Sequence, residues 1–135
     1  MSHPLSDLDG IGPDVMALLR KAGIRSAERL LDAASTPKGR KALAAKTGID
    51  EKTLLAWANM ADRMRVKGVG QDIAKLLQAA GVDTVKELKY RNPANLAQAM
   101  SAANAKRKLV RVLPSEKQLT RIIENAKGVD LKIKY

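Results

Sequence analysis

The chain contains no cysteine and no phenylalanine, and Trp57, Tyr90 and Tyr135 are its only aromatic residues. Without cysteine, disulfide frameworks and thiolate zinc sites are excluded. So few rings argue against nucleic-acid-binding folds that stack bases on aromatic platforms, such as RRM and OB domains. The apolar residues that remain, chiefly Leu, Ala, Val, Ile and Met, suit close helix packing, so we expect an all-α fold. Trp57 lies on an apolar helix face and is expected in the core.

Long apolar runs and catalytic groupings are also missing. No apolar stretch approaches the roughly 20 residues that span a bilayer, and the start, Met1-Ser2-His3-Pro4, does not have the pattern of a signal peptide. We therefore expect a cytoplasmic protein with no membrane partner. No Ser/His/Asp, Cys/His, Walker-type or paired-acid pattern occurs, so we predict no catalytic residue, no metal ligand and no enzyme activity. His3, the only histidine, lies at a terminus that we expect to be frayed.

Positive charge is in excess, with a net charge of +11. Residues 1–62 hold 9 Lys/Arg and 8 Asp/Glu, whereas residues 63–135 hold 16 and 6, so nearly all of the excess lies in the second half. A basic protein of this kind is expected to have an anionic partner. The alternative is a solvated basic surface that has no specific partner.

An internal repeat organises the chain. Residues 10–31 match residues 68–89 at an offset of 58, with 8 identities in 22 positions, including both glycines of each Gly-x-Gly element. The similarity resumes at Asp50–Leu54 and Ser115–Leu119 with an offset of 65, so the second copy has about seven extra residues, expected around Ala102–Pro114. We predict a first unit over 1–62 and a second over 63–135. Because no flexible linker separates them, we expect one compact body.

Capping residues, prolines and apolar spacing predict about nine short helices. Their expected ranges are Pro4–Leu8, Pro13–Ala22, Ser26–Ala34, Pro37–Lys46, Asp50 towards Val66, Gln71–Ala80, Thr84–Tyr90, Pro93–Ala102 and Glu116–Lys127. The alternation in Val129–Tyr135 predicts a short extended tail. Its Lys132 and Lys134 either add to an anion-binding surface or leave the terminus disordered.

The Gly-x-Gly elements, Gly10-Ile11-Gly12 and Gly68-Val69-Gly70, allow a tight turn between helices, with the central apolar residue held in the core. The next helix begins with unpaired amides that carry a partial positive charge, and these amides form a nest for a phosphate oxygen. A Gly-x-Gly turn can also be purely structural, as a sharp corner between two helices.

Both segments resemble the helix-hairpin-helix DNA-binding motif. From about Leu5 to about Lys127, the chain resembles a bacterial family of unknown function built from paired helix-hairpin-helix repeats. The motif implies sequence-independent binding of duplex DNA through backbone phosphates, sometimes with a monovalent cation at the hairpin carbonyls.

The two copies differ in charge. The first is surrounded by Asp7, Asp9 and Asp14, whose carboxylates would repel a phosphate, whereas Arg63, Arg65 and Lys67 precede the second. Asp72, the counterpart of Asp14, weakens this contrast. We predict nucleic-acid contacts from the second element and its basic neighbours: Gly68, Val69, Gly70, Gln71, Lys67, Arg65 and Lys75. Supporting contacts are predicted from Lys106, Arg107 and Lys108, and second-rank contacts from Gly10, Ile11 and Gly12.

The sequence thus predicts a DNA-binding module that grips duplex DNA without sequence preference. One alternative is a protein-interaction or scaffold module whose hairpins are purely structural. A pull-down that survives high salt and nuclease would favour it. Another is a module that binds an anionic small molecule or nucleotide between the two units, which a co-purified ligand would favour.

Overall fold

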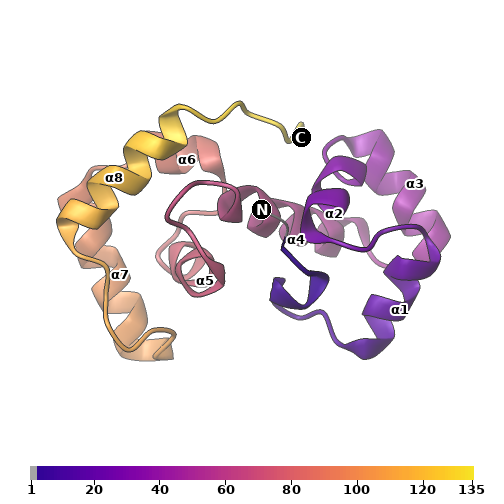
Figure 1. The fold of residues 1–135 in the computed structure, drawn as a ribbon, viewed down its shortest axis with the longest axis horizontal. Coiled ribbons are helices and arrows are strands. Elements are labelled where there is room, and N and C mark those ends of the chain that lie inside the picture. The colour runs from indigo at the N-terminus through magenta and orange to yellow at the C-terminus, as the bar shows by residue number, and fades with distance from the viewer. Residues whose placement is uncertain (1–2) are drawn as a thin grey trace. The chain divides into compact units, whose positions relative to one another are not determined.

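The computed structural model describes residues 3–135, and over this range the chain is all-helical, as predicted (Figure 1). One short 3-10 helix, Leu5–Asp7, is followed by eight α-helices, with no strand in the described range. Their bounds are α1 Pro13–Lys21, α2 Ala27–Ala33, α3 Pro37–Thr47, α4 Glu51–Met64, α5 Gln71–Ala79, α6 Val85–Lys89, α7 Pro93–Arg107 and α8 Glu116–Lys127.

The chain divides into two compact units. The first runs to Asp62 and includes the C-terminal residues Lys132–Tyr135, and the second is Arg63–Leu131. The boundary lies inside α4, between Asp62 and Arg63. The second unit contains α5 to α8, with 14 Lys/Arg and 6 Asp/Glu, and so holds most of the positive charge.

Each unit has a core of aliphatic side chains. In the first unit Leu19, Leu30 and Leu54 are fully buried, and in the second Leu77 and Leu119 are. Burying a Leu side chain contributes about 1.5–3 kcal/mol, so these positions account for much of the stability of each unit. Trp57 is also core, with 7% of its surface exposed, as the sequence predicted.

The same local geometry occurs at positions 58 residues apart. Gly12 and Gly70 have nearly equal backbone angles (φ −92°, ψ −178° and φ −93°, ψ −171°), and each is followed by a nine-residue helix. Both helices close with the same bond: Ile24 N–H donates to Leu19 O, and Val82 N–H to Leu77 O, each at 2.8 Å. The matched sequence positions are therefore matched in local conformation as well.

The extra residues of the second copy fall in two places. Helix α7 has 15 residues where α3 has 11, and the connection that follows spans residues 108–115 instead of 48–50. Because the run Ala102–Ala105 is rich in strong helix formers, α7 continues to Arg107 and does not end at Ala102 as the sequence analysis expected.

The start of the described range corrects one expectation from the sequence. The backbone of His3 is not frayed: its N–H donates to the Glu28 carboxylate at 2.9 Å, and its carbonyl accepts from Ala27 N–H at 2.9 Å. Residues 129–135 follow α8 as a tail that contains no helix or strand. The last four residues of this tail belong to the first unit, where the Tyr135 hydroxyl donates to Asn59 Oδ1 at 2.7 Å and Lys132 forms an ion pair with Asp32.

Candidate nucleic-acid interface

The two Gly-x-Gly turns are called here the first corner (Gly10–Gly12) and the second corner (Gly68–Gly70). Each is anchored by a side chain from the last helix of its copy. Trp57 Nε1 on α4 donates to the carbonyl oxygen of Asp9 at 2.8 Å. Asn125 Nδ2 on α8 donates to the carbonyl oxygen of Lys67, the position equivalent to Asp9, at 2.9 Å. Equivalent carbonyl oxygens are thus held by a tryptophan in the first copy and by an asparagine in the second.

The first glycine of each corner is required by the fold. Gly10 and Gly68 have φ values of +87° and +95°, in the left-handed region that side chains with a Cβ rarely adopt. At Gly68 a Cβ would also lie 3.1 Å from Cγ1 of Ile122. Ile122 is the counterpart of Trp57 at the offset of 65, so one position on the last helix packs beneath both corners.

The second glycine of each corner is not required by the fold. Gly12 and Gly70 have negative φ values that any residue adopts, and a Cβ added at either would meet nothing within 4 Å. The space in front of Gly70 is therefore open. A ligand has room to approach the backbone there.

The two helices that follow the corners, α1 and α5, differ in the backbone N–H groups of their first turns. Neither α1 nor α5 has a side-chain cap at its N-terminus, so the first amides are not satisfied by a capping oxygen. Helix α1 begins with Pro13, which has no N–H, whereas α5 begins with Gln71, which has one. The second corner therefore presents one more backbone donor than the first.

The basic side chains predicted beside the second corner differ in exposure and in hydrogen bonding. Lys67 is exposed, whereas Arg65 and Lys75 are half-buried, and the Arg65 guanidinium donates to the carbonyl of Asp130. Arg63, which the sequence analysis placed among the charges of the second corner, is 2% exposed. It donates to Ala74 O at 3.1 Å and to Asp83 O at 2.6 Å, so it is a structural residue.

Val69, at the centre of the second corner, is 4% exposed, as expected for a residue that pins the turn. Ile11 in the first corner is only half-buried. Asp9 and Asp14 flank the first corner and are exposed. Two carboxylates beside a helix start that lacks one N–H make the first corner a poor anion site.

The predicted supporting cations lie on a different element. Lys106 and Arg107 end α7, and Lys108 is its C-cap with φ +49°; all three side chains are exposed. The connection that follows is held by Asn104, whose side chain accepts from Val110 N–H at 3.0 Å and donates to Val110 O at 3.1 Å. No hydrogen bond or ion pair within residues 3–135 joins these three side chains to the second corner.

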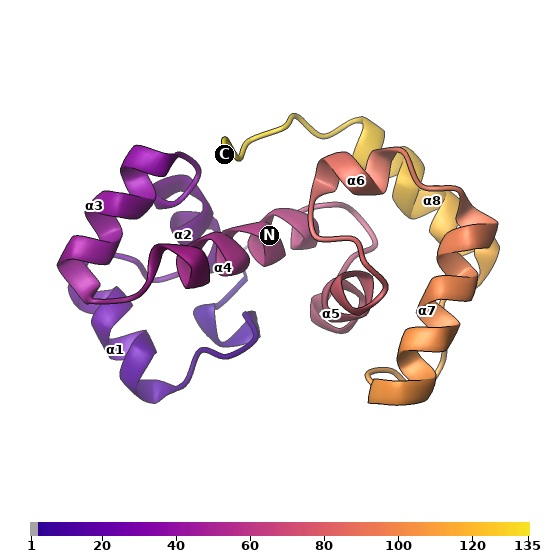
Figure 2. The ribbon, with the colours of Figure 1, turned by 180° about the vertical axis from the view of Figure 1, so that it is seen from behind.

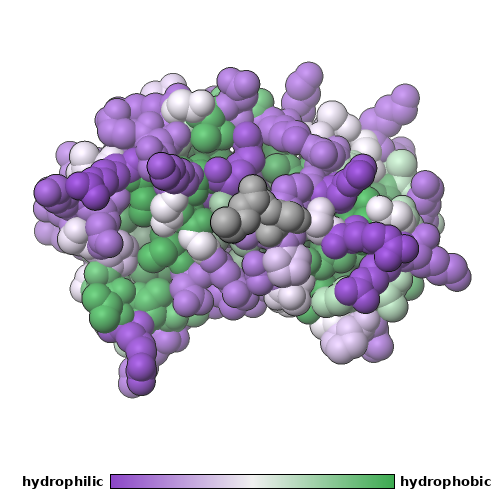
Figure 3. All heavy atoms as spheres, in the orientation of Figure 1, coloured by the Kyte–Doolittle hydropathy of each residue, from purple (hydrophilic) through white to green (hydrophobic). Residues whose placement is uncertain are grey.

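Hydrophilic and hydrophobic residues are distributed unevenly over the face drawn in Figure 3. In the view of Figure 3, hydrophilic residues cover most of each unit, and hydrophobic residues gather over the connection between α7 and α8. Val112 in that connection is 83% exposed.

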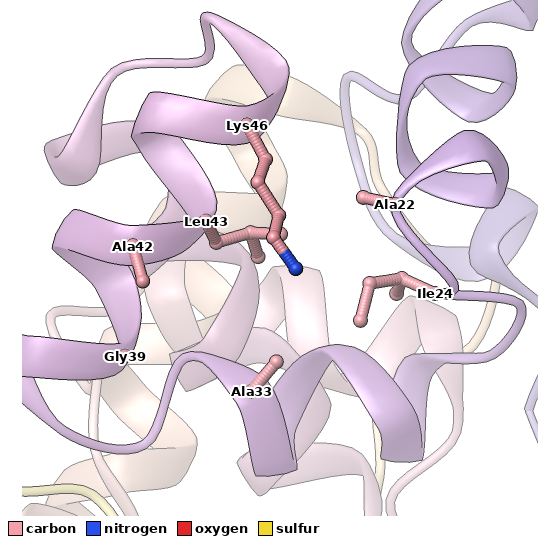
Figure 4. Close-up of a pocket in the computed structure, with 7 residues that line it drawn as sticks. All are labelled: Ala22, Ile24, Ala33, Gly39, Ala42, Leu43 and Lys46. Carbon is pink, nitrogen blue, oxygen red and sulfur yellow. The ribbon is translucent and has the colours of Figure 1, made fainter.

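A small hollow in the first unit has another character. Figure 4 shows apolar side chains from α2, α3 and the segment that follows α1 around it, with the Lys46 side chain pointing in among them. Gly39 lies in its wall, and a Cβ at this position would come within 2.2 Å of Ala33 O, so the close packing of α2 and α3 requires glycine there. The lining residues are Ala22, Ile24, Ala33, Gly39, Ala42, Leu43 and Lys46.

In the described part of the chain, no group of three or more His, Asp or Glu residues is placed to hold a metal ion. None of the helices described is long and apolar enough to cross a bilayer. At the corners, the carbonyls of Asp9 and Lys67 already accept side-chain hydrogen bonds, with which a monovalent cation would compete.

Sequence reasoning missed the anchor of the second corner. Asn125 is equivalent to Met60 at the offset of 65, and the two residues share no chemistry, so the repeat gave no signal for it. Met60 still contacts the first corner, where its sulfur accepts from Asp9 N–H at 3.2 Å.

Comparison with known proteins places the chain in a family. Residues 9–129 match the model of the family described as "Domain of unknown function (DUF4332)", and the chain belongs to that family. No curated protein and no solved structure matches the chain.

Proposed function

We propose that this protein binds duplex DNA without sequence preference, with the two corners acting as helix-hairpin-helix motifs and the second corner as the main phosphate contact. The amides at the start of α5 would donate to a phosphate oxygen, and Lys67 would neutralise its charge. The Lys106–Lys108 run would add contacts to neighbouring phosphates. No catalytic step is part of the proposal.

One observation carries the proposal: residue 70 is a glycine, although the fold would accept a residue with a side chain at this position. Its backbone angles are open to every residue, and its missing Cβ would meet nothing. Ser, Asn or Asp would cap α5 better than Gly. A glycine at this place leaves the backbone accessible to a ligand from outside.

Charge and donor count support the second corner over the first. Gln71 keeps the N–H that Pro13 lacks, and Lys67 stands where the first copy has Asp9. Because a phosphate is an anion that needs donors and positive charge, both differences favour the second corner.

The test compares Gly70→Ala with its matched control Gly12→Ala by fluorescence anisotropy on a blunt duplex. We expect Gly70→Ala to weaken binding about tenfold or more, since a hydrogen bond to a charged group contributes about 1.5–3 kcal/mol. Gly12→Ala should leave binding unchanged. Thermal melts check that both variants fold, as the open space at each glycine predicts.

Two results would contradict the proposal. One is equal DNA affinity for wild type and Gly70→Ala. The other is DNA binding that does not weaken as salt is raised, because phosphate contacts release counterions. A protein partner captured at high salt after nuclease treatment, together with no DNA binding, would favour a scaffold module.

A further inference from the structure

A basic hollow in the second unit is lined by residues other than those assigned to the second corner. Its lining residues are Lys89, Tyr90, Arg91 and Lys127. The first three follow one another at the C-terminal end of α6, and Lys127 ends α8. Helices α6 and α8 lie side by side in both views of the ribbon (Figures 1 and 2). Residues almost 40 positions apart thus meet in one hollow.

Tyr90 is the unusual member of this hollow. Its side chain is 81% exposed, whereas Trp57 is buried in the core and the Tyr135 hydroxyl is bonded to Asn59. In a chain with only three aromatic residues, Tyr90 contributes little to either core. An exposed ring beside cations offers a flat face for stacking.

Three cations line the hollow together with this ring. The Lys89 ammonium is fixed by a 2.6 Å bond to Val129 O, and Lys127 forms a 3.0 Å ion pair with Glu124 at the surface. Arg91 is half-buried. The other carboxylate on these helix ends, Glu87, is engaged in the capping box of Thr84. The hollow therefore has a net positive charge.

Helix capping explains only part of this arrangement. Lys89 and Lys127 lie in the last turns of α6 and α8, where cations stabilise the helix dipole. That role requires neither an exposed phenol nor a guanidinium just beyond the helix. Tyr90 and Arg91 therefore point to a ligand that combines a flat ring with an anion.

We propose that this hollow binds a single unpaired nucleotide, with its base stacked on Tyr90 and its phosphate held by Arg91 and Lys127. In an intact duplex the bases are stacked on one another and cannot cover a protein ring, so this site differs in ligand from the second corner. The proposal does not depend on duplex binding. The nucleotide is either free in solution or an unpaired position in a strand.

Direct binding separates the two sources. Short oligothymidylate is titrated by fluorescence anisotropy, and thymidine monophosphate by calorimetry, against wild type, Tyr90→Ala and Tyr90→Phe. We expect Tyr90→Ala to weaken binding about tenfold, because stacking on an aromatic side chain is worth about 1–3 kcal/mol per base. Tyr90→Phe keeps the ring and should bind as wild type does. Arg91→Gln should weaken binding and flatten its salt dependence.

Tyr135→Ala is the matched control, because it removes another exposed tyrosine from the first unit and should leave binding unchanged. Binding of the monophosphate that Tyr90→Ala weakens supports a free nucleotide. Binding of the oligonucleotide alone, weakened by the same change, supports a strand. Equal binding by wild type and Tyr90→Ala, or binding of neither probe, would overturn the proposal.

Mapping of the contact adds a readout that does not depend on affinity. An oligonucleotide carrying 5-iodouracil is photocrosslinked, and the modified peptide is identified by mass spectrometry. Crosslinking at Tyr90 is expected, and crosslinking confined to other peptides would contradict the proposal. Gly70→Ala should leave this crosslink intact. The crosslink therefore tests the hollow independently of the proposal that the second corner binds duplex DNA.

Discussion

The side-chain amide of Asn125 donates a hydrogen bond to the carbonyl oxygen of Lys67 across 2.9 Å, joining the last turn of α8 to the residue before the second corner. The equivalent carbonyl in the first copy, that of Asp9, is held by Trp57 at 2.8 Å. In both copies the last helix fixes the entry to the corner. The second corner is therefore held by α8 as well as by its own turn.

Removal of this anchor should affect DNA binding more than folding. Asn125→Ala loses one exposed hydrogen bond, so we expect the free energy of unfolding to fall by about 1 kcal/mol or less. Duplex affinity should fall because the corner is less well ordered. Urea titration and anisotropy measure the two effects. Trp57→Phe is the matched control: it removes the donor to Asp9 and should not change DNA affinity.

The backbone donor of Gln71 can be removed without changing the fold. Pro13 shows that proline is accepted at the first residue of this helix, after a glycine with almost identical angles. We expect Gln71→Pro to fold as wild type does and to bind duplex DNA about tenfold more weakly, because one charge-assisted hydrogen bond is lost.

The reverse exchange is the control for Gln71→Pro. Pro13→Gln restores the N–H in the first corner, where Asp9 and Asp14 remain, and should not improve binding. A large gain in affinity from Pro13→Gln would show that the first corner is also a phosphate site. Circular dichroism confirms that the helix content of each variant is unchanged.

Lys67 should account for part of the salt dependence of duplex DNA binding. Log K for duplex DNA is expected to fall with log salt by about 0.9 for each phosphate that is neutralised. Lys67→Gln should make this slope shallower by about one such unit, and Lys67→Glu should abolish most binding. Lys21→Glu, at an exposed position that ends α1 in the first unit, should do little. Equal losses from Lys67→Glu and Lys21→Glu would contradict the assignment to the second corner.

Arg63 should act through stability. Its guanidinium is buried and donates to the carbonyls of Ala74 and Asp83, so Arg63→Ala leaves one buried and one partly buried acceptor without that donor. We expect a loss of about 3 kcal/mol or more in the free energy of unfolding. Arg63→Ala should unfold at lower urea, whereas Lys67→Gln should melt like wild type. If Arg63→Ala is as stable as wild type but fails to bind DNA, Arg63 contacts DNA and the structural assignment is wrong.

Helix positions followed from local signals in the sequence. Proline at a first turn, Ser or Thr at an N-cap and glycine at a C-terminus act within a few residues, so the bounds of α1, α5 and α8 were predicted within one residue. The end of α7 was missed because no stop signal follows Ala102. The matching of the two glycine pairs was also visible in the sequence, since equal spacing imposes equal turns.

The sequence by itself determined the all-helical fold, the two matched corners and the bias of charge towards the second half, because helix caps, glycine spacing and composition are local properties. Only the tertiary structure decided which charged groups are accessible. It buried Arg63, tied the C-terminal tail to the first unit and placed Asn125 under the second corner. It also brought Lys127 beside Tyr90, because contacts between distant residues arise only when helices pack.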